Sequence, residues 1–327
     1  MGAQLRVFRR RIKSVQQTQK ITRAMEMIAS SRIVKAQNAL NAALPYTREL
    51  ILALSAAVSN AADAKHPLTS ETDKRNRAAV LLITADRGLA GAYSSNIIRE
   101  GEGLNAMLRE HGVEPVPFLV GRKAVNFYRF RERPIEGAYT GFSDQPTVED
   151  AKEVALGLLA SFLSDSETEG GVDEIHVVYT HFVNMGRQEV RVLRMLPIEV
   201  VEQVAGQSYE TQIFPAGGAP KDTGEAPKRT TEKAAIPLYE FEPDANAVLN
   251  ALLPQYVENL VYTAMLEAAA SEHAARRRAM KSATDNADEL IRTLTRQENQ
   301  ARQAEITQEI SEIVGGADAL SSATAGR

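Results

Sequence analysis

The chain has 327 residues and a formal net charge of −4, with 38 Lys and Arg against 42 Asp and Glu. Its apolar share of 44% and charged share of 24% are those of globular proteins, which excludes a wholly disordered chain and an integral membrane protein. Because cysteine is absent, disulfide frameworks, thiol nucleophiles and cysteine-ligated zinc are excluded, and we expect a reducing compartment. No apolar run is long enough to span a bilayer and the first residues lack the apolar core of a signal peptide, so we expect neither a membrane span nor export.

Residues 1–58 are expected to form one long helix, because they contain a single proline, Pro45, and a single glycine, Gly2. Pro45 should kink or locally open this helix. Apolar side chains recur at alternating steps of three and four residues, which is the spacing of a coiled-coil seam. The predicted seam consists of Leu5, Phe8, Ile12 and Val15 and, after a polar gap, of Ile21, Met25 and Ile28.

Residues 59–243 contain 14 of the 18 Phe and Tyr side chains and are therefore expected to hold the globular core. Apolar runs and helical patterns alternate along this segment, which predicts a Rossmann-like α/β domain whose sheet is mainly parallel with an antiparallel edge. The predicted strands are 78–84, 115–120, 135–142, 174–182 and 189–196. One predicted helix follows the first strand and ends at residue 110, and two others span 122–130 and 148–163.

Two segments fall outside this α/β pattern. Residues 164–171 form an acidic loop, and residues 203–237 are rich in Gly, Pro, Thr and Lys, a composition typical of mobile segments. The residues alone assign a role to neither segment.

Residues 244–327 contain only Pro254 and three glycines near the end, so we expect a second long helix that Pro254 distorts. Each terminal helix carries one narrow apolar stripe and therefore needs a partner helix, for which the other is the nearest candidate. We predict a long antiparallel coiled coil of the N- and C-terminal helices, with residues 59–243 inserted between them. The seam predicted for the second helix consists of Ala283, Ala287, Leu290, Leu294, Ala301, Ile306, Ile310 and Ile313.

The turn Thr84–Gly91 follows the first strand, where a phosphate-binding loop could lie, but its glycines have the spacing of neither nucleotide-binding motif. Gly88 and Gly91 are instead expected to give a tight turn from strand to helix. The five histidines form no ligand pair, and no two side chains have the spacing of a catalytic acid and base. We therefore expect a chain that is not an enzyme and has no metal site, no cofactor and no small-molecule substrate of its own.

Positive charge is concentrated on both predicted helices. Residues 1–35 carry nine Lys and Arg against Glu26 alone, and residues 276–281 carry four more. One interpretation of this charge is an ordinary solvated helix face. Two clusters on one rod instead favour an acidic partner: nucleic acid, a membrane surface or an acidic protein. A basic coiled-coil adaptor that binds nucleic acid is therefore an alternative function, as is an α/β nucleotide enzyme with helical arms.

Several stretches resemble the gamma subunits of bacterial F-type ATP synthases, in particular those of actinobacteria. The N-terminal signature of that family is similar to residues 10–29 (RRIKSVQQTQKITRAMEMIA). Its C-terminal signature is similar to residues 271–286 (SEHAARRRAMKSATDN) and 301–310 (ARQAEITQEI). The match extends to residues 83–91 (ITADRGLAG) and so covers both predicted helices and the first part of the middle.

The resemblance implies a central-stalk rotor shaft. The two helices would turn inside a ring of alternating alpha and beta subunits, while the α/β domain would contact the epsilon subunit and the membrane rotor c-ring. The chain would be a non-catalytic subunit that couples proton-driven rotation to ATP synthesis and helps to regulate ATPase activity and proton flow. It would be a peripheral protein on the cytoplasmic side of the cell membrane, without a nucleic-acid partner.

The resemblance and the charge together imply contact residues on the shaft. Met25 and Arg23 would face the acidic lever loop of a beta subunit, and Arg302, Gln303 and Thr307 match the hydrogen-bonded catch of the family. Four apolar side chains would contact the apolar collar of the ring: Ile306, Ile310, Ile313 and Val314. Met25 and these isoleucines fit the positions of an ordinary coiled-coil seam equally well. The expected contact residues are Arg9, Arg10, Arg23, Met25, Arg276, Arg277, Arg302, Gln303, Thr307, Ile310 and Ile313.

For the acidic loop 164–171 two hypotheses stay open. It is either a solvated loop without a role, or a brake whose negative charge engages basic groups of the rotor ring or of epsilon.

Overall fold

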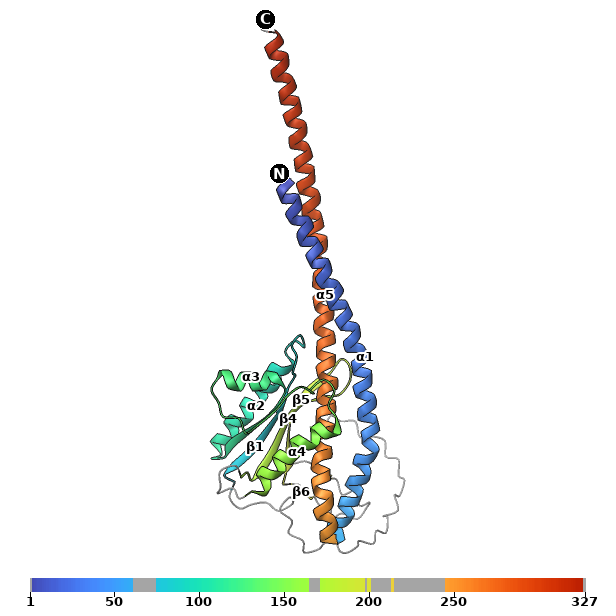
Figure 1. The fold of residues 1–327 in the computed structure, drawn as a ribbon, viewed down its shortest axis with the longest axis vertical. Helices are drawn as coiled ribbons and strands as arrows, with labels where there is room; N and C mark the ends of the chain where they lie inside the picture. Colours follow the sequence, from blue (N-terminus) through green and yellow to red (C-terminus); the bar gives the residue numbers. More distant parts are fainter. Residues whose placement is uncertain are drawn as a thin grey trace, which may run out of the picture. The chain divides into compact units, whose positions relative to one another are not determined.

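The computed structural model describes residues 2–60, 75–164, 171–197, 199–200, 213–214 and 245–325. Its most prominent elements are two long helices, α1 (Gly2–Asn60) and α5 (Ala245–Ala325), with the α/β domain between them in the chain (Figure 1). α1 has 59 residues and α5 has 81, so the two long terminal helices predicted from the scarcity of Pro and Gly are confirmed. Both helices continue through their proline.

The chain divides into two compact units, one made of residues 1–29 with 276–327 and the other of residues 30–275. α1 and α5 therefore contribute to both units. The domain boundaries expected at residues 58 and 243 stay predictions. Most of the segment 203–237 lies outside the described residues, and so do residues 165–170 of the acidic loop.

In the first unit the two helices pair in opposite directions. Three polar contacts define their register: Arg9 Nε with Glu298 Oε1 at 2.8 Å, Gln19 Nε2 with Asp288 Oδ1 at 2.5 Å, and Thr22 Oγ1 with Thr284 Oγ1 at 2.7 Å. The residue number falls along α5 as it rises along α1, which only antiparallel helices produce. The predicted antiparallel pairing of the two termini is therefore confirmed.

The seam of α1 differs from the predicted seam beyond Val15. It continues through the polar Gln19 and Thr22 to the buried Ala29, whereas Ile21 and Ile28 are 60% and 55% exposed. The prediction was wrong here because it followed the apolar residues and not the helical repeat. Instead of an apolar contact, the hydroxyl groups of Thr22 and its partner on α5 meet inside the seam.

The seam of α5 is also partly different from the predicted one. Ala287 and Leu294 are buried as predicted, but Leu290, Ile306, Ile310 and Ile313 are 47%, 47%, 56% and 71% exposed. Since Arg9 lies opposite Glu298, the first residue of α1 lies opposite about residue 305. About the last 20 residues of α5, between five and six turns, therefore continue past the N-terminal end of α1 (Figure 1).

The second unit is built on a five-stranded sheet with the order β3-β2-β1-β4-β5. Its parallel strands are β1 (Arg77–Ile83), β2 (Glu114–Val120), β3 (Gly137–Tyr139) and β4 (Glu174–Phe182). The edge strand β5 (Gln188–Leu196) pairs with β4 in the antiparallel direction. The mainly parallel sheet with an antiparallel edge is confirmed, with β3 shorter than predicted. A separate pair consists of β6 (Glu199–Val200) and β7 (Ile213–Phe214).

Helices cover both faces of the five-stranded sheet. They are α2 (Tyr93–Glu110) and α3 (Arg122–Phe130) on one face and α4 (Val148–Leu163) with parts of α1 and α5 on the other. Successive residues of β1, such as Leu81 and Leu82, enter opposite cores because side chains alternate along a strand. Leu54 of α1 and Val257 of α5 are buried in the same core as Leu81. The helix pair is thus itself a layer of the α/β domain.

Gly121 allows the close approach of β1 to the start of α3. Its φ is +90°, and a Cβ atom there would lie 2.3 Å from the backbone oxygen of Thr84. We expect Gly121→Ala to lower the free energy of unfolding by about 2 kcal/mol or more, through backbone strain and the clash. Denaturant unfolding of the full chain measures this loss.

The matched control for this variant is Gly103→Ala in α2, where a new Cβ atom meets nothing within 4 Å. This change should raise the free energy of unfolding by about 0.5–1 kcal/mol, because alanine restricts the unfolded chain and favours a helix. Equal stability of Gly121→Ala and the wild type would contradict the geometry of this turn.

Candidate functional site

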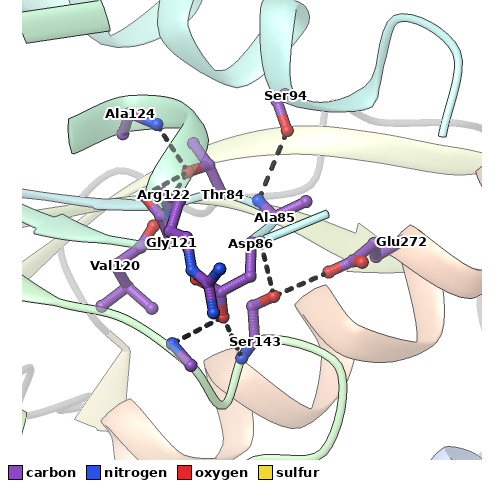
Figure 2. A network of polar contacts seen from close by, with 11 residues as sticks. Thr84, Ala85, Asp86, Ser94, Val120, Gly121, Arg122, Ala124, Ser143 and Glu272 are labelled. Atoms are coloured by element: carbon purple, nitrogen blue, oxygen red, sulfur yellow. Dashed lines mark hydrogen bonds and ion pairs between the residues drawn. The ribbon is translucent and has the colours of Figure 1, made fainter. Parts of the chain in front are cut away.

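The turn after β1 lies at the carboxyl edge of the parallel strands, where open α/β sheets bind their ligands. The Asp86 side chain, 5% exposed, occupies this position (Figure 2). Its carboxylate accepts hydrogen bonds from the backbone N–H groups of Arg122 at 3.1 Å, Gly141 at 2.8 Å and Ser143 at 3.0 Å. Because Arg122 is the first residue of α3, the anion site of that helix N-terminus is filled by the chain's own carboxylate.

Local contacts hold the end of β1 against α3 in this arrangement. Thr84 Oγ1 donates to the backbone oxygen of Val120 at 2.9 Å and accepts from the backbone N–H of Ala124 at 3.1 Å (Figure 2). Leu89 and Gly91, with φ of 64° and 58°, then reverse the chain before α2. The tight turn predicted from the glycines is confirmed at Gly91, whose left-handed conformation costs a glycine little.

The loop 140–145, which follows β3, joins Asp86 to both long helices. Ser143 Oγ donates to Glu272 Oε2 of α5 at 3.2 Å (Figure 2). The backbone oxygen of Asp144 lies 3.0 Å from His273 Nε2, and the Asp144 carboxylate forms an ion pair with Arg32 of α1. This loop is therefore a polar junction between the sheet and the helix pair.

α5 makes further polar contacts within the second unit. Ser271 Oγ donates to Thr180 O at 3.0 Å, Tyr93 Oη donates to Ala268 O at 3.1 Å, and His181 Nδ1 lies 2.5 Å from Glu267 Oε2. Burial, followed by the negative charge of Glu267, raises the pKa of Tyr179 well above its usual value. Tyr179 therefore stays neutral beside this carboxylate at physiological pH.

The predicted contact residues all belong to the first unit, but they differ in exposure. Arg276 is only 8% exposed and Arg277 and Met25 are half-buried, so Arg276 cannot belong to an exposed basic surface of this chain. Arg9 is exposed but forms an ion pair with Glu298. The exposed remainder consists of Arg10, Arg23, Arg302, Gln303, Thr307, Ile310 and Ile313.

Exposed apolar side chains form two strips on the first unit. Ile21 and Ile28, seven residues apart, lie on one face of α1 on either side of Met25. Ile306, Ile310 and Ile313 follow one another at steps of four and three on α5. Contiguous exposed apolar side chains mark surfaces that bind another protein, so both strips are candidate partner contacts.

The junction residues were not identified from the sequence. Asp86 and Ser143 are 57 residues apart, and Ser143 and Glu272 are 129 apart, so no local pattern connects them. The available signal was an aspartate three residues after the end of a buried strand. Among the described residues, no helix is long and apolar enough to cross a membrane, and no three His, Asp or Glu side chains gather as a metal ion would require.

The structure combines a pair of long antiparallel helices with an inserted α/β domain, and the helix pair has apolar strips that the described residues leave exposed. This combination is typical of the shaft of a larger assembly. The sequence model of the ATP synthase family matches residues 4–320 of this chain. The chain is 58% identical over 322 residues to the ATP synthase gamma chain of Kineococcus radiotolerans, with 98% of each chain covered. It is 52% identical over 326 residues to that of Thermobifida fusca, with 100% of this chain and 99% of the relative covered. The chain therefore belongs to the ATP synthase gamma chain family.

Solved structures share this fold. The rotor of the Euglena gracilis mitochondrial ATP synthase matches with a TM-score of 0.57 and 17% identity over 94% of this chain and 100% of the other. The central stalk and c-ring structure of the Tetrahymena thermophila enzyme matches with a TM-score of 0.52 and 19% identity over 80% of this chain and 99% of the other. The resemblance noted in the sequence is thus confirmed, and with it a non-catalytic subunit with a central-stalk role. Nothing supports the nucleic-acid adaptor.

We expect the isolated chain to bind no ATP, because the Asp86 carboxylate occupies the amides that a phosphate group would need. Titration calorimetry at ATP concentrations up to the millimolar range should give no saturable heat. Saturable binding in the micromolar range would contradict this expectation and favour a nucleotide-binding function.

Proposed function

We propose that residues 1–29 and 276–325 turn inside a ring of alternating alpha and beta subunits, and that the α/β domain carries the contacts to epsilon and to the c-ring. The observation that carries this proposal is the pair of exposed apolar strips, which no described residue of this chain covers. An isolated shaft in water would gain nothing from them, whereas a surrounding ring would bury them.

The strip on α1 is the proposed contact with a beta subunit. Met25 lies between the exposed Ile21 and Ile28, and the exposed Arg23 belongs to the same helical turn as Met25. An apolar contact beside a positive charge suits the acidic lever loop that the family resemblance implies, because the charge attracts the loop and the apolar side chains are buried by it.

The C-terminal part of α5 is the proposed contact with the inside of the ring. Arg302 and Gln303 are exposed and able to form the hydrogen bonds of the catch, while Thr307 Oγ1 also donates to the backbone oxygen of Gln303 at 2.9 Å. Ile310 and Ile313, with Ile306 and Val314, would bear on the apolar collar. Because apolar contacts have no preferred direction, such a surface can slide as the shaft turns.

Asymmetry explains how rotation would change the catalytic sites. Apolar and basic side chains lie on particular faces of the helix pair, so each orientation of the shaft presents a different surface to each beta subunit. A beta subunit whose conformations differ in their contact with that surface changes its populations as the shaft turns. Proton-driven rotation is thereby converted into sequential changes of nucleotide affinity, and resistance to rotation would limit ATPase activity and proton flow.

The membrane side of the proposal rests on the relatives. The Tetrahymena match is a central stalk described together with its c-ring. By analogy the α/β domain would meet the c-ring, and the chain would be a peripheral protein on the cytoplasmic side of the cell membrane.

Purification from native membranes tests the assembly directly. A tag on the C-terminus of this chain should recover alpha, beta and epsilon subunits together with the c-ring in mild detergent. A chain recovered alone, or with other proteins only, would contradict the proposal.

The exposed basic side chains of α1 should attract the ring. Replacing Arg10, Lys20 and Arg23 by Gln changes only exposed side chains, so the chain should remain folded. Each contact contributes roughly 0.2–1 kcal/mol, and the three together should lower assembly or ATP synthesis several-fold, with a smaller effect at high salt, which screens these charges in the wild type as well. ATP synthesis by reconstituted vesicles measures this loss.

The matched control removes three exposed charges from the α/β domain: Arg109, Arg129 and Lys152. We expect ring assembly with this variant to equal that of the wild type. If the two triple variants behaved alike, the basic surface of α1 would be ordinary solvated surface.

A further inference from the structure

We propose that Asp86 is a positioning residue for rotary coupling. Its carboxylate holds the loop 140–145 in the shape in which the loop contacts α1 and α5, so that the sheet and the two helices turn as one body. This inference rests on the proposed function as a rotor shaft and adds to it the contacts that fasten the sheet to residues 30–60 of α1 and 245–275 of α5.

Asp86 connects three chain segments: the end of β1, the start of α3 and the loop 140–145. Its Oδ2 atom accepts from the backbone N–H groups of Gly141 and Ser143 at 2.8 and 3.0 Å. Its Oδ1 atom accepts from the backbone N–H of Arg122 at 3.1 Å and lies 3.6 Å from Arg122 Nε. The backbone N–H of Asp86 in turn donates to Ser143 Oγ at 2.8 Å (Figure 2). The loop is therefore held from both the side chain and the backbone of one residue.

The same loop holds the two long helices. Ser143 Oγ, which accepts from Asp86, donates to Glu272 of α5, so one hydroxyl group links the end of β1 to the helix. Glu272 and His273 are each 1% exposed, and the polar contacts they make with the loop are thus shielded from water. Asp144 adds the ion pair with Arg32 of α1. Both helices are bonded to a loop whose shape depends on Asp86.

Apolar packing alone would fasten the sheet less firmly. The core that the sheet shares with α1 and α5 supplies free energy, but apolar contacts are non-directional and tolerate sliding of one surface on another. Hydrogen bonds and ion pairs fix direction and register. Removal of the Asp86 carboxylate would leave three N–H groups without their acceptor, and the loop would have to move to satisfy them.

The test uses the complete ATP synthase in inverted membrane vesicles. ATP-driven proton pumping and ATP hydrolysis are measured on the same vesicles, and the amount of assembled complex is determined by immunoblot. For Asp86→Ala we expect proton pumping per ATP hydrolysed to fall by roughly threefold or more, because every hydrogen bond that the carboxylate accepts is charge-assisted and none can form with alanine. Hydrolysis per assembled complex should stay close to that of the wild type.

Two further variants keep the test decisive. Ser143→Ala removes only the hydroxyl that links Asp86 to Glu272, and it should lower the same ratio by a smaller factor; it decides the outcome if Asp86→Ala does not assemble. The matched control is Glu102→Gln, which removes the ion pair between α2 and Arg133, just after α3, while the amide oxygen of Gln can still accept the hydrogen bond from Tyr128. This control should leave the ratio unchanged.

Three results would overturn the inference. The first is an unchanged ratio of proton pumping to ATP hydrolysis in Asp86→Ala and Ser143→Ala. The second is a fall of pumping and hydrolysis in the same proportion in these variants. The third is an equal fall of the ratio in the control Glu102→Gln. Vesicles without this chain separate the inference from the proposed function. If coupling persisted without the chain, the proposed function would fail, whereas coupling that needs the chain but not Asp86 contradicts the positioning role alone.

Discussion

The antiparallel pairing of α1 and α5 is the constraint on which the rest of the structure depends. Each helix has a narrow seam, and its stability comes from its neighbour more than from its own propensity. The pairing places the two terminal helices side by side, so the part of the chain between residues 60 and 245 is an insertion between them. Residues 50–57 of α1 and 249–268 of α5 also cover one face of the sheet, so these parts of the two helices share one core with it.

α5 changes its kind of contact along its length within this shared core. Near its start, Leu253 and Val257 are fully buried among apolar side chains. Some ten to fifteen residues later Glu267, Ser271 and Glu272 form polar contacts with the sheet and with the loop after β3. The apolar part supplies most of the free energy, and the polar part determines the exact position of the helix on the sheet. A domain that transmits force needs both.

The helices and strands could be predicted from the sequence because their signals are local. Scarce Pro and Gly marked α1 and α5, and the continuous apolar run of β1 marked a strand covered on both faces. The seam was less predictable, since apolar residues of a subunit serve partners as well as its own core, and Ile21 and Ile28 face outwards. The junction was hidden because Asp86, Ser143 and Glu272 are far apart in the chain and meet only after the sheet has formed.

The part of α5 beyond the end of α1 has a further consequence. A single helix of about 20 residues is only marginally stable in water, and two adjacent glycines, Gly315 and Gly316, each weaken it by about 1 kcal/mol. Its exposed isoleucines cannot repay this cost until another protein buries them. Under the proposed function, burial of these side chains inside the ring would stabilise the helix at this end, so that its helical order would be coupled to assembly.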